Sequence, residues 1–187
     1  TTEIGHIVDS FKDKVAIIVE QTASVGDQSA NVSAEVSAFQ TQFESVASSS
    51  QTTIEHIHRA KDRSFASLVK MDHIIYMQNA YISVEANGDE GQARTVEVDH
   101  YNCRLGKWYY DGTGAAIFGS TRAFKALEKP HAQVHGAVHA AVEASRGNWL
   151  RDEAVRGRIV ASIESAEQAS REVIQLISDM EHEKHGR

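Results

Sequence analysis

Three histidines follow one another at intervals of four residues in the segment KPHAQVHGAVHAA, at His131, His135 and His139. On an α-helix, side chains four residues apart lie on the same face, one turn apart, and this spacing lets two imidazoles bind one metal ion. Histidines with the same spacing also occur on solvated helix faces. The spacing therefore indicates a metal site without establishing one.

His73 and Cys103 could complete such a site. His73 lies among apolar residues in a helical pattern, and Cys103 is the only cysteine of the chain. If three helices pack around one core, they can bring one sulfur and three imidazole nitrogens to a point, which is a donor set that four-coordinate zinc prefers. Each residue taken alone has a simpler explanation, as a hydrogen-bonded core histidine or as a small buried apolar side chain.

The first sixty residues carry a heptad repeat of apolar residues. Its two series are Ile4, Phe11, Ile18, Val25, Val32, Phe39 and Val46, and Val8, Val15, Thr22, Ser29, Val36 and Phe43. A repeat of seven over this length predicts a helix that supercoils with a partner along the apolar seam. Thr22 and Ser29 weaken the second series. A dimeric or hairpin coiled coil is favoured over a long helix packed inside a monomeric bundle, because packed bundle helices rarely keep a strict seven-residue phase.

The remainder of the chain also predicts helices. A helix continues from about residue 63 to NGDEG at 87–91, where glycines and asparagine indicate a loop, and a short helix carries VDHYNCRLGKWYY. Pro130 is expected as the first residue of the next helix, which ends near Gly147, and Asn148 as the N-cap of a long final helix. We predict an all-α protein: a coiled-coil stalk for signalling and dimerisation over 1–62, and a four-helix-type bundle with a long C-terminal helix over 63–187.

Composition narrows the partners. The chain has 187 residues and a formal net charge of −7, which disfavours nucleic acid and anionic membranes. It contains no run of about 18 apolar residues that could span a bilayer. A single cysteine excludes an internal disulfide framework and fits a reducing compartment, so we expect a cytoplasmic location.

Three segments, SLVKMDHIIY, HYNCRLGKWYYDG and PHAQVH, resemble in their order and separation the chemoreceptor zinc-binding (CZB) domain family. The most specific motif is C-x-L-G-x-W, formed by Cys103, Leu105, Gly106 and Trp108, followed by H-x-x-x-H. The resemblance covers roughly residues 63–147. Domains of this family occur at the ends of bacterial cytoplasmic chemoreceptors, also called methyl-accepting chemotaxis proteins, and beside diguanylate cyclase domains.

The resemblance implies a set of zinc ligands made of three histidines and one thiolate: His73, Cys103, His131 and His135. His139 matches no position of the family and is expected to be structural or to support a ligand. His100 is an alternative ligand, since it precedes Cys103 by three residues. Asp99 could accept a hydrogen bond from a ligand imidazole, as carboxylates beside metal sites do.

The resemblance implies one main function and two alternatives. The domain would sense zinc, or an oxidant such as hypochlorous acid that reacts with a redox-active Cys103, and pass the change along the coiled coil. Alternatively, zinc is a structural element of a dimerising module, or the domain regulates a diguanylate cyclase. We expect a homodimer that reaches a chemotaxis kinase and coupling protein through other parts of the receptor. An enzyme is not expected, because four protein ligands leave no open position for a catalytic water.

Overall fold

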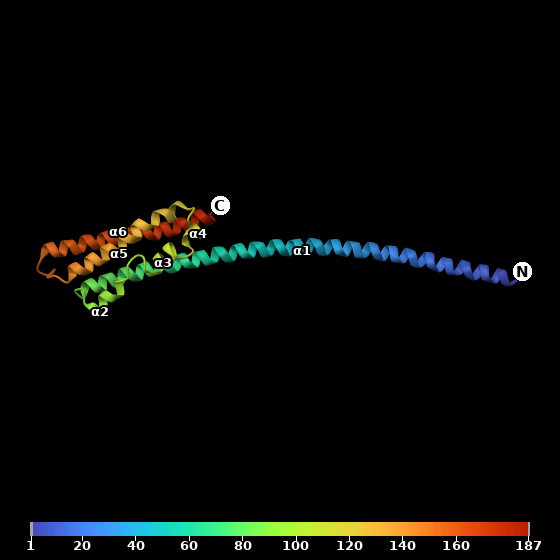
Figure 1. Cartoon of the computed structure of the whole chain (residues 1–187), viewed down its shortest axis with the longest axis horizontal. Helices are drawn as coiled ribbons and strands as arrows, with labels where there is room; N and C mark the ends of the chain where they lie inside the picture. Colours follow the sequence, from blue (N-terminus) through green and yellow to red (C-terminus); the bar gives the residue numbers. More distant parts are fainter. Residues whose placement is uncertain (1, 187) are drawn as a thin grey trace. The chain divides into compact units, whose positions relative to one another are not determined.

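The computed structural model describes residues 2–186, in which all regular elements are helices and no strand occurs. The elements are α1 (Thr2–Glu85), α2 (Glu90–Ala93), the 3-10 helix η1 (Arg94–Val96), α3 (Arg104–Tyr110), α4 (Gly114–Phe118), α5 (Arg122–Ser145) and α6 (Glu153–His185) (Figure 1). The prediction of an all-α fold with long N-terminal and C-terminal helices is confirmed. No helix within this range combines the length and apolar character that crossing a bilayer requires.

The chain divides into two compact units, one that ends at Ile57 and one that begins at His58. In the first unit the described residues belong only to the N-terminal part of α1, and every residue of the leading heptad series is exposed: Ile4, Phe11, Ile18, Val25, Val32, Phe39 and Val46. Taken by itself, this unit leaves the apolar stripe exposed. Burial of the stripe requires another surface.

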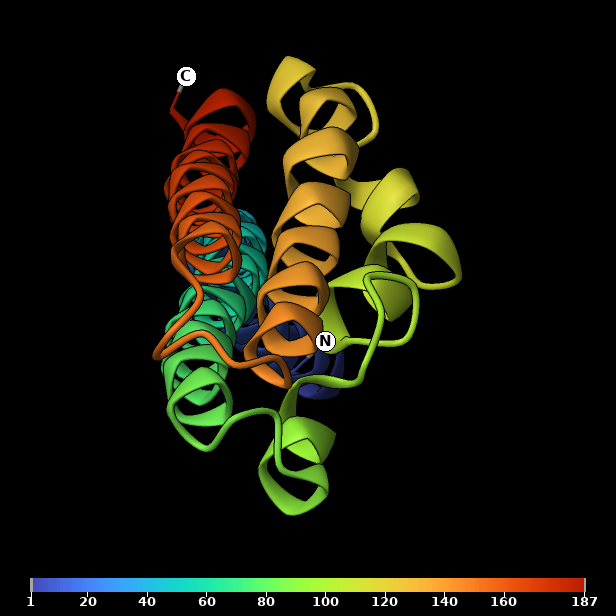
Figure 2. The same ribbon diagram turned by 90° about the vertical axis from the view of Figure 1, so that its left-hand side faces the viewer.

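In the second unit, the C-terminal part of α1 packs with the antiparallel pair α5 and α6, and the short helices lie beside them (Figure 2). The apolar stripes of the three long helices form the core, whose members include Val69, Ala80, Leu127, Val134, Val138, Val173 and Ile177. Polar contacts join α1 to α6 as well, since Lys70 Nζ donates to Ser178 Oγ at 2.7 Å. This packing holds the helix that bears His73 against the helix that bears His131 and His135.

Two helix starts differ from the sequence prediction. Pro130 lies inside α5 and not at its first residue, because Thr121 caps the helix nine residues earlier by accepting a hydrogen bond from the amide of Phe124 at 3.2 Å. A proline costs an internal hydrogen bond, and burial of the α5 core face offsets that cost. The N-cap of α6 is Asp152 and not Asn148, since the Asp152 carboxylate accepts from two α6 amides.

The loop predicted at 87–91 is confirmed only in its first three residues, because α2 begins at Glu90. Asn87 and Gly88 adopt positive φ angles of 56° and 65° directly after α1 ends at Glu85. Glycine takes this conformation without a steric penalty, and asparagine is one of the few other residues that tolerate it. The turn therefore ends α1 and redirects the chain toward η1.

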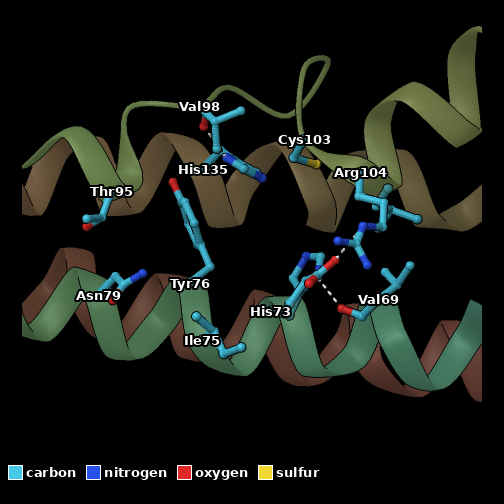
Figure 3. A pocket seen from close by; sticks show the side chains of 12 residues that line it. Val69, His73, Ile75, Tyr76, Asn79, Thr95, Val98, Cys103, Arg104 and His135 are labelled. Atoms are coloured by element: carbon cyan, nitrogen blue, oxygen red, sulfur yellow. Dashed lines mark hydrogen bonds and ion pairs between the residues drawn. The ribbon is translucent and has the colours of Figure 1, made fainter.

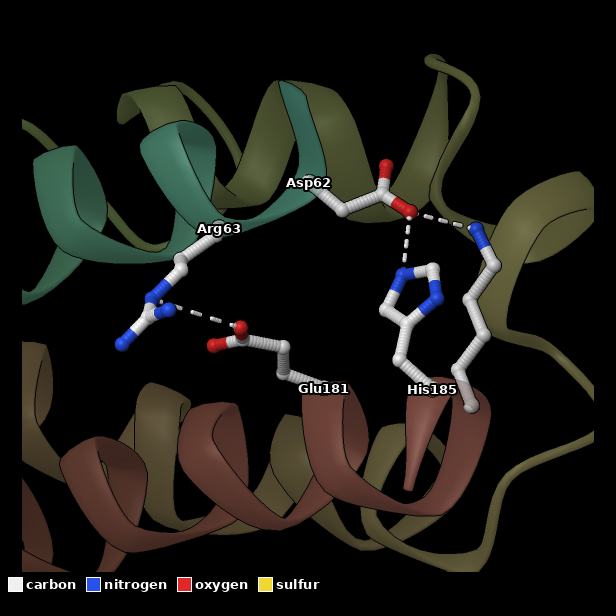
Figure 4. A network of polar contacts seen from close by, with 5 residues as sticks. Asp62, Arg63, Glu181 and His185 are labelled. Carbon is white, nitrogen blue, oxygen red and sulfur yellow. Dashed lines mark hydrogen bonds and ion pairs between the residues drawn. The ribbon is translucent and has the colours of Figure 1, made fainter. Parts of the chain in front are cut away.

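A polar cluster fixes the end of α6 on α1 (Figure 4). The buried carboxylate of Asp62 accepts hydrogen bonds from Lys184 Nζ at 2.5 Å and His185 Nε2 at 2.8 Å. Arg63 also lies 3.9 Å from a Glu181 carboxylate oxygen, with its side chain largely exposed. The last turn of α6 is thereby held against α1 by charge as well as by apolar packing.

Candidate metal centre

The structure brings Cys103, His131 and His135 together. Their candidate donor atoms all lie within 4.8 Å of one another, and both histidines are buried. The Cys103 sulfur lies 3.2 Å from Nε2 of His131, and the two imidazole rings are 5.1 Å apart between centroids. The i, i+4 spacing on α5 therefore places both histidines on the face that meets the cysteine.

Cys103 is the N-cap of α3, so it precedes that helix, whereas the sequence pattern predicted a position within it. Its backbone is extended, with φ −69° and ψ 168°, and its sulfur accepts a hydrogen bond from the Gly106 amide at 3.3 Å. Burial raises the pKa of the Cys103 thiol, and the Gly106 amide opposes this effect only in part. The free thiol is thus protonated at neutral pH, and a bound cation would displace that proton.

The surroundings of Gly106 explain why the C-x-L-G-x-W motif has a glycine at this position. A Cβ atom at this position would lie 1.9 Å from the His100 carbonyl oxygen and 2.6 Å from that of Tyr101. No side chain fits there, because both neighbours are main-chain atoms. The first turn of α3 can therefore fold back on the preceding loop only with glycine at this position, and this fold fixes the Cys103 sulfur.

Backbone carbonyls set the tautomers of two histidines. Nδ1 of His135 lies 2.8 Å from the Val98 carbonyl oxygen, and Nδ1 of His73 lies 3.2 Å from that of Val69. A carbonyl can only accept, so each Nδ1 carries the proton and each Nε2 has a free lone pair. Metal-binding histidines use the same arrangement, in which the second ring nitrogen donates to a fixed oxygen.

His73 supplies the test of whether these residues fit a cation. Its side chain is buried, and its Nε2 has no hydrogen-bond partner. All other buried side-chain nitrogen and oxygen atoms of the described residues have one. Its ring centroid lies 5.5 Å from that of His131, although its donor atom is outside the 4.8 Å cluster. A buried lone pair without a donor is costly, and a bound cation would satisfy it. The residues present fit zinc.

His73, Cys103 and His135 line one cavity of about 270 Å³ (Figure 3). They come from α1, from the residue before α3 and from α5. Burial lowers the pKa of His131 to about 3 and that of His135 to about 4, and the neighbouring histidines add to the effect. Burial also lowers the pKa of His73. All three imidazoles are therefore neutral near pH 7, as metal ligands must be.

The other polar candidates have different contacts. His139 Nε2 lies 2.8 Å from the Val96 carbonyl oxygen, so this residue ties α5 to η1. The Asp99 carboxylate is exposed and accepts from the amides of Tyr101 and Asn102 and from the Asn102 side chain. It thus shapes the turn that leads to Cys103. None of its contacts in the described structure supports the predicted hydrogen bond to a ligand imidazole.

His100 lies near the cluster without joining it. Its ring centroid is 6.0 Å from that of His131, and it packs against Tyr101 at 3.9 Å. The roles of the Val69 and Val98 carbonyls could not be predicted from the sequence, because a main-chain acceptor leaves no signal in residue types. Only the folded loop shows which carbonyl faces which imidazole.

The comparisons with known proteins address the same region. Residues 73–142 match the model of the family described as the chemoreceptor zinc-binding domain. The matched range begins at His73 and contains Cys103 and both α5 histidines of the cluster. No curated protein and no solved structure matches the chain significantly. The segment 73–142, with its cluster of one thiol and buried histidines, is a chemoreceptor zinc-binding domain.

Proposed function

We propose that this chain is a cytoplasmic sensory part of a bacterial chemotaxis receptor, in which His73, Cys103, His131 and His135 hold a zinc ion. The observation that carries the proposal is the origin of the donors: they come from α1, from the start of α3 and from α5. The helix that carries His73 also carries the exposed heptad stripe. A ligand change at the site therefore acts on the helix that reaches the partner.

The residues of the site have distinct tasks. The Val69 and Val98 carbonyls keep the Nε2 lone pairs of His73 and His135 directed at the centre. Gly106 directs its amide at the Cys103 sulfur. A bound zinc ion would keep this sulfur as a thiolate, the form that reacts with electrophiles.

An oxidant response is the second part of the proposal. The Cys103 thiolate attacks the chlorine of hypochlorous acid and expels hydroxide, and water then displaces chloride to leave a sulfenic acid. The sulfur is oxidised by two electrons, which the chlorine accepts. A sulfenic acid lacks the charge with which a thiolate binds a cation, so the hold of Cys103 on the site weakens.

The packing around α3 supports a route from Cys103 to α1. Trp108 lies on the helix that Cys103 caps, and its ring is 4.7 Å from that of Phe65 on α1. Trp108 also contacts Phe118 and Phe124, each at 5.7 Å between centroids. A shift of α3 would therefore alter the packing of α1 near the point where the stalk begins.

A second copy of the chain is the proposed partner of the stripe. The exposed series Phe39, Phe43 and Val46 lies on one face at the alternating spacing of a coiled-coil seam. Contacts with a chemotaxis kinase and a coupling protein are assigned to other parts of the receptor.

The test is the response of the stalk to metal and oxidant. A spin label is attached at Ser49, outside the seam, through a non-natural amino acid so that Cys103 stays free, and distances across the dimer are measured with zinc, after chelation, and after hypochlorous acid. We expect the distance distribution to shift in both treatments, and the oxidant effect to vanish in Cys103→Ser. If metal leaves while the distances stay constant, zinc is only a structural part of a dimerising module.

A further inference from the structure

The cavity at the metal centre is larger than the centre needs. It has a volume of about 270 Å³, whereas a single water molecule accounts for roughly 30 Å³ of liquid. Beyond the three donor residues, buried apolar side chains such as Val69 and Leu105 form its walls. Space for a small molecule therefore remains beside the sulfur when an ion is held by the donors.

The rim of the cavity reaches solvent through half-exposed residues. Ile75 is 47% exposed, and an ion pair joins Arg104 Nε to Asp72 Oδ2 at 3.3 Å. The side chains of this pair are 50% and 36% exposed, respectively. Both residues line the same cavity as Cys103 and His73, and Figure 3 shows Arg104 next to Cys103. No other charged residue lines this cavity in the described structure.

We propose that this cavity is the route by which small molecules reach Cys103, and that the Arg104–Asp72 pair makes it selective for uncharged ones. The inference rests on the proposed function, since it names the class of reagent that the site admits: small uncharged electrophiles, such as hypohalous acids and peroxides. The two opposite charges balance at the rim, and the remaining residues that line the cavity are apolar or uncharged. A charged reagent consequently gives up hydration without gaining a net partner charge.

A matched pair of alkylating reagents measures this selectivity. Iodoacetamide is uncharged and iodoacetate is an anion of nearly the same size, and both react with a thiolate by displacing iodide. Cys103 is the only cysteine, so mass spectrometry of the intact chain reports reaction at this site alone. The ratio of the two rates cancels any change in the thiolate fraction. N-acetylcysteinamide, which has no carboxylate, supplies at the same pH the ratio for an open thiol.

For the metal-free protein at low salt, we expect the iodoacetamide-to-iodoacetate ratio to exceed that of N-acetylcysteinamide by about fivefold or more. Asp72→Asn leaves Arg104 unbalanced and should lower the ratio about fivefold, whereas Arg104→Gln leaves Asp72 and should raise it by a similar factor. Lys107→Gln removes the same charge from the exposed face of α3, outside the cavity, and should leave the ratio unchanged. Added salt should reduce the differences.

A second pair of variants tests the route itself. Ile75→Trp should narrow the rim and slow both reagents, while Ile74→Trp, at an equally exposed position outside the cavity, should not. Both positions are on the surface of α1, so the variants keep the fold, which circular dichroism checks. The proposal would be overturned if Ile75→Trp and the parent protein reacted at equal rates. It would also be overturned if neither Asp72→Asn nor Arg104→Gln changed the iodoacetamide-to-iodoacetate ratio.

The measurement needs neither zinc nor a signalling partner. If the ratios follow these expectations while the distances across the stalk do not change with oxidant, the access route is supported and the sensory function is wrong. If the stalk responds to oxidant while the ratios do not change, the function stands and this route is wrong.

Discussion

The sulfur of Cys103 lies 3.2 Å from Nε2 of His131, although 28 residues separate the two in the chain. This contact joins the cap of α3 to the face of α5, and His73 approaches the same point from α1. A donor set drawn from three elements links the packing of those elements to one bound ion.

Zinc content is the direct check of the ligands. We expect about one zinc per chain by elemental analysis, with the metal lost or strongly reduced in His73→Ala, Cys103→Ala, His131→Ala and His135→Ala. His139→Ala is the matched control, because this histidine bonds to the Val96 carbonyl and continues the same stripe. It should keep the metal, as should Asp99→Ala. Loss of zinc in His139→Ala with retention in His73→Ala would reassign the fourth ligand.

Because Nε2 of His73 has no hydrogen-bond partner, His73→Leu should have opposite effects on the free energy of unfolding with and without metal. In the metal-free protein, His73→Leu removes a buried unsatisfied nitrogen, so the free energy of unfolding should stay constant or rise, by up to about 1 kcal/mol. With zinc, the same variant should be less stable than the parent because a ligand is missing. Urea unfolding with chelator and with zinc measures both. A large loss of stability in the metal-free variant would show that Nε2 has a partner in solution.

Gly106 and Gly136 form a matched pair of glycines. Gly106→Ala places a Cβ against two carbonyl oxygens and should cost at least about 2 kcal/mol and weaken zinc binding. Gly136 is exposed within α5, and a methyl group added there would have no neighbour within 4 Å, so Gly136→Ala should stabilise the helix by about 0.5–1 kcal/mol. Thermal unfolding compares the two. A neutral Gly106→Ala would contradict the tight turn at α3.

The depressed pKa values of the histidines predict acid sensitivity of the metal-free protein. In the folded state the pKa is about 3 for His131 and about 4 for His135, against 6.5 in the unfolded chain. The unfolded state binds more protons between these values, so stability is full above pH 6.5 and is lost as the pH falls toward 4. Each histidine contributes a slope of up to about 1.4 kcal/mol per pH unit. Urea unfolding at several pH values should give a shallower slope in His135→Leu.

The Asp62 cluster predicts a local effect at the end of α6. Asp62→Ala leaves Lys184 and His185 without their acceptor and should cost about 1–3 kcal/mol. Hydrogen exchange should speed up in the last turn of α6. Arg63→Ala breaks a long contact at an exposed side chain and should change stability by less than about 0.5 kcal/mol. Equal effects of the two variants would mean that the buried carboxylate adds nothing.

The stripe on α1 shows how far local pattern can predict structure. Side-chain periodicity follows from helix geometry alone, so the heptad series and the common face of His131 and His135 could be predicted from spacing. The helix starts could not, because Thr121 and Asp152 compete with other polar residues nearby for the role of cap. The prediction for Pro130 was wrong for a related reason: its local penalty is outweighed by packing of the whole α5 face.

The sequence by itself determined the all-α class, the family of the segment 73–142 and the residue types that can bind zinc. Only the tertiary structure decided how they are presented: Cys103 as a cap, Nε2 of His73 as a buried nitrogen without a partner, and Asp99 as the acceptor that shapes the turn before Cys103. The physical reason is that residue type and spacing act along one helix. The contacts between α1, α3 and α5 depend on loop closure and on hydrogen bonds to main-chain carbonyls. Every residue carries a carbonyl, so no sequence pattern shows which one is used.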